Sequence, residues 1–155
     1  MACWLMKSEP DVFSIDDLEN KPKQTEPWSG VRNYQARNFM RDGMEIGDHV
    51  FFYHSSCEEP GIVGLMRVAS RAYPDPTQFD RKSEYYDPKS TREEPRWMLV
   101  DVCFERHLSR AITLAELRKH ARDLKGFRLL EPGSRLSIMP VEPEHWSYIL
   151  ALENC

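Results

Sequence analysis

The residues best suited to binding a ligand lie at positions 28–38, with the sequence WSGVRNYQARN. Residues 28–41 hold three arginines and no acid, although the whole chain has a formal net charge of −4. A large aromatic ring, a glycine that lets another group come close, and amide and guanidinium donors could form the rim of a site for a planar polar ligand. The same stretch could instead be a helix entry with Trp28 in the core. Both interpretations stay open at this point.

Residue patterns typical of catalysis do not occur in the sequence. There is no Gly-x-Ser-x-Gly motif, phosphate-binding loop or dinucleotide fingerprint. The five histidines are isolated, and although His54-Ser55 could be half of a nucleophile system, no nearby carboxylate is placed to orient the imidazole. The four scattered cysteines lack the spacing of a zinc or redox motif. The sequence therefore predicts no catalytic residues, no metal ligands and no cofactor.

Length and charge limit the function classes further. A chain of 155 residues fits one domain, expected to span residues 1–155. A formal net charge of −4 argues against a protein that holds nucleic acid mainly by neutralising phosphates. Any nucleic-acid contact must therefore use a local basic face or a pocket. Unpaired cysteines, no signal peptide and only short apolar runs predict a soluble cytoplasmic protein without a membrane partner. Nothing in the sequence indicates its oligomeric state.

The elements that must position these residues are strands at about 3–7, 48–54, 62–69, 97–105 and 135–139, and helices at about 14–18, 33–42, 113–120 and from Pro143. Gly61 and Gly64, in or beside a strand, indicate a bulge or a close approach. Residues 71–96 form a long insertion whose aromatics predict an ordered structure. The pattern is typical of an α+β domain with a curled mixed sheet that can close into a barrel.

Several short motifs in order resemble an EVE domain, and the resemblance covers essentially the whole chain. They are Met6–Pro10, Trp28–Asn38, Gly47-Asp48 with Val50–Ser55, Pro60–Gly64, Thr77–Asp80 with Ser83 and Tyr85–Ser90, Pro95–Trp97 and Val100–Val102. The resemblance implies a PUA-like small mixed β-barrel with flanking helices, related to the YTH domains that read methylated adenine. It also implies a non-catalytic module that binds 5-methylcytosine or 5-hydroxymethylcytosine, in DNA rather than RNA, by taking the base out of the stack into a pocket.

The residues fit that implied function physically. Extracting a base costs a few kcal/mol, and one aromatic stacking contact returns roughly 1–3 kcal/mol. The predicted base-binding residues are Trp4, Lys7, Ser8, Trp28, Asn33, Tyr34, Tyr53, His54, Ser55 and Asp80. The predicted phosphate contacts are Arg32, Arg37, Lys82 and Lys89. We expect Trp28→Ala to abolish modified-base binding and to leave the fold intact.

Two other functions remain open from the sequence. The PUA/YTH-type fold also suits an RNA-binding module, because the fold by itself leaves the sugar undecided. An enzyme acting on a small nucleotide-like ligand would use His54 as its acid or base.

Overall fold

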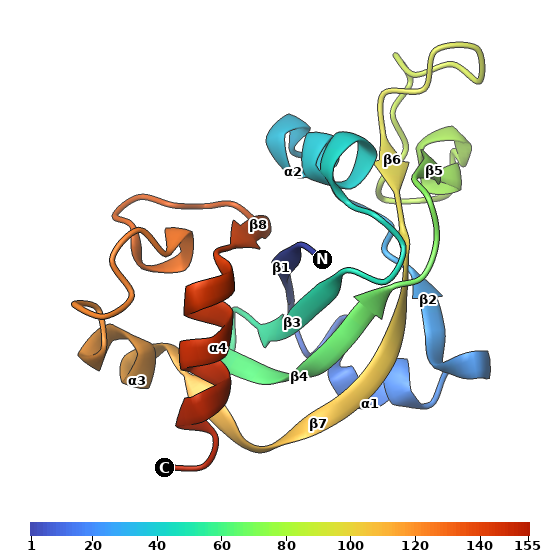
Figure 1. The fold of residues 1–155 in the computed structure, drawn as a ribbon. Coiled ribbons are helices and arrows are strands. Elements are labelled where there is room, and N and C mark those ends of the chain that lie inside the picture. The colour runs from blue at the N-terminus through green and yellow to red at the C-terminus, as the bar shows by residue number, and fades with distance from the viewer.

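The computed structural model describes all 155 residues, and its centre is one curled sheet of six strands (Figure 1). The strands lie in the order β2-β7-β4-β3-β1-β8. Their bounds are β1 Cys3–Ser8, β2 Thr25–Pro27, β3 His49–His54, β4 Gly61–Val68, β7 Asp101–Thr113 and β8 Ile138–Val141. The pair β1 and β3 is parallel and every other pair is antiparallel. The prediction of an α+β fold with a mixed, barrel-like sheet is confirmed, although β2 and β8 leave two free edges.

Short helices and a second small sheet complete the fold. The helices are α1 Ile15–Glu19, α2 Tyr34–Asn38, α3 Leu114–Lys119 and α4 Pro143–Leu152, with 3-10 turns at Pro22–Gln24, Pro76–Phe79 and Arg128–Leu130. The small sheet pairs β5 Tyr73–Pro74 with β6 Met98–Leu99. No helix is long and apolar enough to cross a membrane.

The caps that the sequence predicts begin two of these helices. The Ser14 hydroxyl accepts the backbone N–H of Asp17, whose carboxylate in turn accepts the N–H of Ser14. Thr113 caps α3 through the N–H of Glu116. Both arrangements satisfy N–H groups that have no partner inside the helix. The predicted helix over 33–42 is real but changes type, because residues Phe39–Gly43 form a wider π-helical turn closed by Met44 N–H on Phe39 C=O at 2.9 Å.

Period-two alternation along the central strands sends side chains to two separate cores. Phe52 of β3 packs with Trp4, Met6 and Trp28 on one face of the sheet. Its neighbour Phe51 packs on the other face, with Leu5, Tyr53, Phe127 and Ile149. Because successive side chains of a strand point to opposite faces, each strand supplies both cores. We call the first core the pocket face and the second the α4 face.

The bulge and the close approach that the sequence indicated at the β4 glycines are present. The pairing of β4 with β7 shifts between Ile62 and Gly64. A Cβ at Gly64 would lie 2.7 Å from the carbonyl oxygen of Arg106 on β7. Gly64 therefore lets β4 and β7 approach at a bulge, which confirms both sequence-based interpretations of this position.

Candidate nucleic-acid interface

A pocket of about 490 Å³ opens on the pocket face, beside the end of β1. Its volume lies within the range of about 300–1,000 Å³ that is usual for small-ligand sites. We call it the Trp28 pocket. It is lined by Lys7, Ser8, Glu9, Val12, Phe13, Glu26, Pro27, Trp28, Ser29, Gly30, Val31, Arg32, Tyr85 and Ser137.

Trp28 is at once a wall of the pocket and part of the core. Its side chain is only 8% exposed. It lies edge-to-face with Phe52, at 5.6 Å between ring centroids, and with Phe13, at 6.2 Å. Its backbone N–H donates to the carbonyl of Val100 at 2.9 Å. The two sequence-based interpretations of Trp28 therefore describe the same residue, and its position is held by packing on two sides.

Gly30 gives the pocket its shape, because an aromatic ring lies directly on it. Gly30 has φ +84°, and a Cβ there would lie 2.8 Å from the ring of Tyr85. The close approach that the sequence indicated thus comes from the protein itself. Any side chain at position 30 would strain the backbone and push Tyr85 away from the pocket wall.

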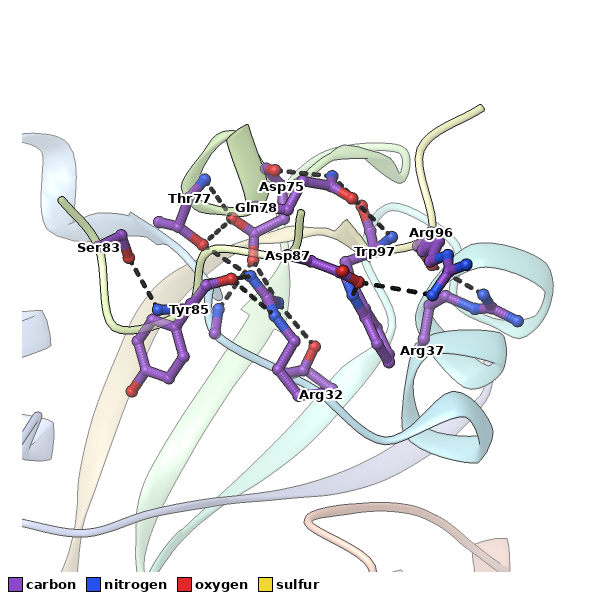
Figure 2. Close-up of polar contacts among 12 residues, drawn as sticks. Arg32, Arg37, Asp75, Thr77, Gln78, Ser83, Tyr85, Asp87, Arg96 and Trp97 are labelled. Atoms are coloured by element: carbon purple, nitrogen blue, oxygen red, sulfur yellow. Dashed lines mark hydrogen bonds and ion pairs between the residues drawn. The ribbon is translucent and has the colours of Figure 1, made fainter. Parts of the chain in front are cut away.

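Arg32 joins the pocket wall to the insertion through a dense polar network (Figure 2). Its Nε and Nη2 donate to the carbonyl of Tyr85 at 3.1 and 2.6 Å, and Nη2 also donates to the hydroxyl of Thr77 at 3.0 Å. Its Nη1 lies 3.2 Å from a carboxylate oxygen of Asp75, which is 1% exposed. All three guanidinium nitrogens are engaged. Arg32 therefore positions the pocket wall. The network leaves Arg32 no free donor for the phosphate contact that the sequence predicted.

Asp75 is the centre of this network. Its carboxylate accepts from the backbone N–H of Gly30 at 2.8 Å and from the backbone N–H and hydroxyl of Thr77 at 2.8 and 2.6 Å. Because buried carboxylates are stable only when their oxygens are paired, Asp75 fixes residues 30 and 77 relative to each other. The pocket wall and the start of the insertion become one unit.

A second layer of hydrogen bonds orders the rest of the insertion. The fully buried Gln78 amide donates to the carbonyls of Asp75 and Trp97 at 2.7 and 2.8 Å and accepts from Ser90 and from the Trp97 N–H. The indole of Trp97 donates to Asp87 at 2.8 Å, and this bond lowers the pKa of the Asp87 carboxyl. The expectation of an ordered insertion at 71–96 is confirmed.

Two further predicted base-binding residues lie at the pocket, next to Trp28. The hydroxyl of Ser8 donates to the carbonyl of Phe13 at 2.6 Å, which leaves its oxygen able to accept. Lys7 is half-buried, and burial lowers the pKa of its ammonium. That ammonium lies 5.8 Å from the centroid of the Tyr53 ring.

Other predicted base-binding residues lie in the core or hold the backbone. Trp4 is buried and donates its indole N–H to Asp48 at 3.0 Å. Tyr53 is 2% exposed in the core of the α4 face, where burial raises its pKa to about 12. Ser55 donates its backbone N–H to the carbonyl of Ser8 at 3.0 Å. None of the three lines the Trp28 pocket. Trp4 lies on the pocket face but deeper in its core, Tyr53 points to the α4 face, and Ser55 is held by main-chain pairing.

His54 serves the fold through its ring. Its Nε2 accepts the backbone N–H of Ile15 at 3.1 Å, which satisfies the first turn of α1. Burial lowers the pKa of its imidazole. One of the two ring nitrogens of His54 is therefore engaged in holding α1.

The remaining predicted residues lie around α2 and in the insertion. Asn33 caps α2 through the N–H of Ala36 at 2.9 Å, and Tyr34, 51% exposed, stacks on Trp97 at 4.7 Å between ring centroids.

Asp80 is a turn residue that accepts the N–H of Lys82. Arg37 donates to the carbonyl of Arg96 at 2.7 Å. The side chains of Lys82 and Lys89 are exposed and form no hydrogen bond or ion pair. Apart from Arg32, the predicted phosphate contacts do not line the pocket.

Several lining residues come from segments that the sequence did not single out as ligand contacts. Phe13 follows β1, and Ser137 reaches the pocket because its carbonyl accepts the N–H of Lys7 at 2.8 Å. Glu9 and Glu26 add two carboxylates to the wall. The turn after β1 was a signal for Glu9 and Phe13, whereas Ser137 depends on the pairing of β8 with β1.

One group of side chains outside the pocket has the residue types of a metal site. Asp16 and Glu19 of α1 and His107 of β7 bring their ligand atoms within 4.8 Å of one another. His107 Nε2 lies 3.0 Å from Glu19 and 3.6 Å from Asp16. The group lies at the surface and its members bond to each other, so we interpret it as a hydrogen-bonded contact that joins α1 to β7.

Comparison with known proteins agrees with this architecture. The family model described as EVE domain matches residues 2–152. Thymocyte nuclear protein 1 of Danio rerio is 49% identical over 97% of this chain and 71% of its own length. The crystal structure of human THYN1 protein in complex with 5-methylcytosine containing DNA matches with a TM-score of 0.95 and 47% identity, over 100% of this chain and 99% of that one. A crystal structure of a Pseudomonas putida protein matches with a TM-score of 0.93 and 49% identity, over 98% and 99% of the two chains.

Proposed function

We propose that this chain, which belongs to the EVE domain family, is a non-catalytic module that binds DNA and takes a modified cytosine into the Trp28 pocket. One observation carries the proposal. A pocket with aromatic and polar walls occurs in a chain that is 47% identical, at a TM-score of 0.95, to a protein crystallised with DNA containing 5-methylcytosine. We also propose that residues 1–155 act as a single domain.

The aromatic wall provides the energy that a flipped base needs. Removing a base from the stack costs a few kcal/mol, and each aromatic stacking contact returns roughly 1–3 kcal/mol. Trp28, Phe13 and Tyr85 are the rings at the pocket. Burying the extra methyl group against Val12 and Phe13 adds only about 0.8 kcal/mol, a factor of about four in affinity. Polar contacts must therefore carry most of the discrimination between bases.

The polar wall suits cytosine. Carboxylates accept the exocyclic amino group of cytosine, which thymine and uracil lack. Glu9 and Glu26 supply two carboxylates at the pocket, and the Ser8 hydroxyl oxygen supplies a further acceptor. We infer that these groups read the base edge and that the methyl group is recognised by fit.

The cysteines limit the compartment in which this protein works. The chain has four cysteines, none of which forms a disulfide. Reduced cysteines suit the cytoplasm and the nucleus alike. We therefore retain a cytoplasmic location as a proposal, and note that the vertebrate relatives carry the name of a nuclear protein.

The deciding experiment is a binding titration against matched oligonucleotides. They would carry cytosine, 5-methylcytosine, 5-hydroxymethylcytosine or N6-methyladenine, as DNA and as RNA, at two salt concentrations. We expect a preference for a modified cytosine in DNA that survives the higher salt. Stronger binding to the RNA set would establish an RNA module instead, and no binding to any oligonucleotide would overturn the proposal.

Two exposed residues offer a matched pair of variants for the pocket. Val12 is 66% exposed and lines the pocket mouth, whereas Ile46 is 55% exposed and lies elsewhere. Both changes, Val12→Glu and Ile46→Glu, add one negative charge to the surface without touching the core. We expect only Val12→Glu to weaken binding to 5-methylcytosine DNA, because like charges at the mouth repel the phosphates. Equal weakening in both variants would mean that the pocket mouth does not contact the DNA.

A further inference from the structure

The segment from residue 118 to residue 135, which we call the basic segment, differs in charge from the rest of the chain. It holds six basic residues and two acids, in a protein whose formal net charge is −4. By contrast, the insertion at 71–96 balances six basic residues with six acids. The basic segment includes the end of α3, the Arg128–Leu130 turn and the loop that leads into β8, along one edge of the molecule (Figure 1).

The basic side chains of this segment have no partners. Six arginines elsewhere pair with carboxylates, at Arg32, Arg41, Arg67, Arg96, Arg106 and Arg110. In the basic segment no lysine or arginine forms an ion pair or a side-chain hydrogen bond, and all but Arg128 are exposed; the six are Arg118, Lys119, Arg122, Lys125, Arg128 and Arg135. Arg128 alone has a side-chain contact of note, 5.7 Å from the centroid of Phe39.

The acids of the segment do not neutralise this charge. Asp123 accepts the phenol of Tyr148 at 2.9 Å, and Glu131 lies at the surface. Exposed cations without a partner create a local positive potential that attracts anions, even on a protein whose net charge is negative. A polyanion is the ligand that matches several such charges along one segment.

The basic segment ends two residues before the wall of the Trp28 pocket. Ser137, two residues after Arg135, lines that pocket. Another hollow, of about 400 Å³, lies between Arg128, Arg135 and the start of α2 at Asn33 and Gln35, and Glu131 is the one acid in its lining. Asn33 directly follows Arg32 of the pocket wall. Arg135 and Arg128, which line that hollow, are therefore the basic residues of the segment with the most direct link to the pocket wall.

We propose that the basic segment is the docking surface for the phosphate backbone of the DNA strand that flanks the flipped base. This inference rests on the proposed function and deepens it. Of the residues that the sequence suggested for the phosphates, Arg32 and Arg37 are engaged within the protein. Lys82 and Lys89 are exposed, but they lie in the insertion, where acids balance the basic residues. The basic segment takes the role of binding phosphates. The pocket then reads the base, whereas the segment binds the DNA backbone whatever its sequence.

The test compares two double variants that remove the same charge on different sides of the pocket. They are Arg128→Gln/Arg135→Gln in the basic segment and Lys82→Gln/Lys89→Gln in the insertion. Affinities for DNA with cytosine and with 5-methylcytosine would be measured over a series of KCl concentrations. Thermal melting would confirm that both variants fold. If the removal of Arg128 disturbs the packing on Phe39, the variant Arg122→Gln/Arg135→Gln, which changes two exposed residues, replaces the first one.

The arginine variant is expected to weaken binding to both DNAs by the same factor. Its slope of log affinity against log salt should fall by roughly 1 for each phosphate that the protein no longer neutralises, while the preference for 5-methylcytosine stays unchanged. The lysine variant, which removes the rival contacts that the sequence predicted, should keep the wild-type salt slope. An unchanged salt slope in a folded arginine variant, or a lower slope in the lysine variant instead, would overturn the docking surface. A preserved preference for 5-methylcytosine in the wild-type protein would then leave the proposed function standing. If the wild-type protein binds no DNA, both proposals fail.

Discussion

The two faces of the sheet are built in different ways. On the α4 face, Phe51 stacks on Trp146 at 3.9 Å, and a regular helix covers a continuous apolar core. On the pocket face, the cover is α1, α2 and a long insertion that is tied down by Asp75, Gln78 and Arg32. Apolar packing leaves no room for a ligand, whereas a cover held by hydrogen bonds can stand away from the core. Both faces thus contribute an apolar core, and the hydrogen-bonded cover leaves a pocket on one of them.

The strongest test of this contrast changes neighbouring residues of β3. Phe51 and Phe52 are fully buried on opposite faces. We expect Phe51→Ala and Phe52→Ala each to lower the free energy of unfolding by roughly 3–5 kcal/mol, as measured by chemical denaturation. In the milder Phe51→Leu and Phe52→Leu variants, only the second should weaken binding to 5-methylcytosine DNA, because Phe52 supports Trp28. Equal decreases in affinity would show that the faces are not separate in function.

The next largest effect is expected for the tryptophans of the two faces. Trp28→Phe removes part of a stacking surface and should cost only a fraction of the roughly 1–3 kcal/mol of binding free energy that a whole stacking contact contributes. Trp146→Phe, on the α4 face, should leave that affinity unchanged. The burial of Trp28 also alters the expectation from the sequence, since Trp28→Ala removes a core side chain and should cost roughly 3–5 kcal/mol of stability. Similar affinities for the two Phe variants would exclude Trp28 as a base contact.

A smaller effect should separate the positioning network from ordinary surface charge. Arg32→Lys keeps the charge but removes the fork that binds Tyr85 and Thr77, and should cost about 1.5–3 kcal/mol of stability. Hydrogen exchange of amides 75–90 should become faster in this variant. The control is Arg67→Lys, since Arg67 pairs with Glu105 at the surface and such pairs contribute at most about 1 kcal/mol. Unchanged exchange in Arg32→Lys would mean that Asp75 alone holds the insertion.

The smallest effect concerns pH. Burial lowers the pKa of His54 from its ordinary value of 6.5, although the nearby Asp16 opposes the shift. The unfolded chain then binds more protons than the folded one, so the contribution of His54 to stability is complete above pH 6.5 and is lost as the pH falls below it. Melting temperatures of the wild type should decline below that pH more steeply than those of His54→Gln. Parallel curves would indicate that His54 is not held neutral.

The sequence predicted the sheet better than its edges. The central strands alternate clearly, so β1, β3 and β4 lie close to where they were expected. The strand expected at 97–105 is divided at Val100 into β6 and a β7 that continues to Thr113, since its polar second half shows no apolar alternation. The edge strands β2 and β8 were missed or displaced, because Pro27 and Pro140 read as breakers although edge strands tolerate proline.

The site was predictable only where it is local. Trp28 and Ser8 line the pocket as expected, since the chemistry of their own segments indicated them. Asn33 and Tyr34 were expected beside Trp28, but the helix that begins at Tyr34 directs them to a cap and to Trp97. Tyr85 and Ser137 are brought to the pocket by long-range hydrogen bonds, which leave no periodic signal in a single sequence.

The pairing of β1 with both β3 and β8 has a consequence for synthesis on the ribosome. Cys3 pairs with Val141, near the other end of the described chain. Contacts between such distant residues form slowly, because a long loop must close first. Because Ser137 joins the pocket only when β8 docks on Lys7, a nascent chain can bury much of its sheet before the pocket is complete. Completion of the pocket is therefore a late event, reached when the last strand has emerged.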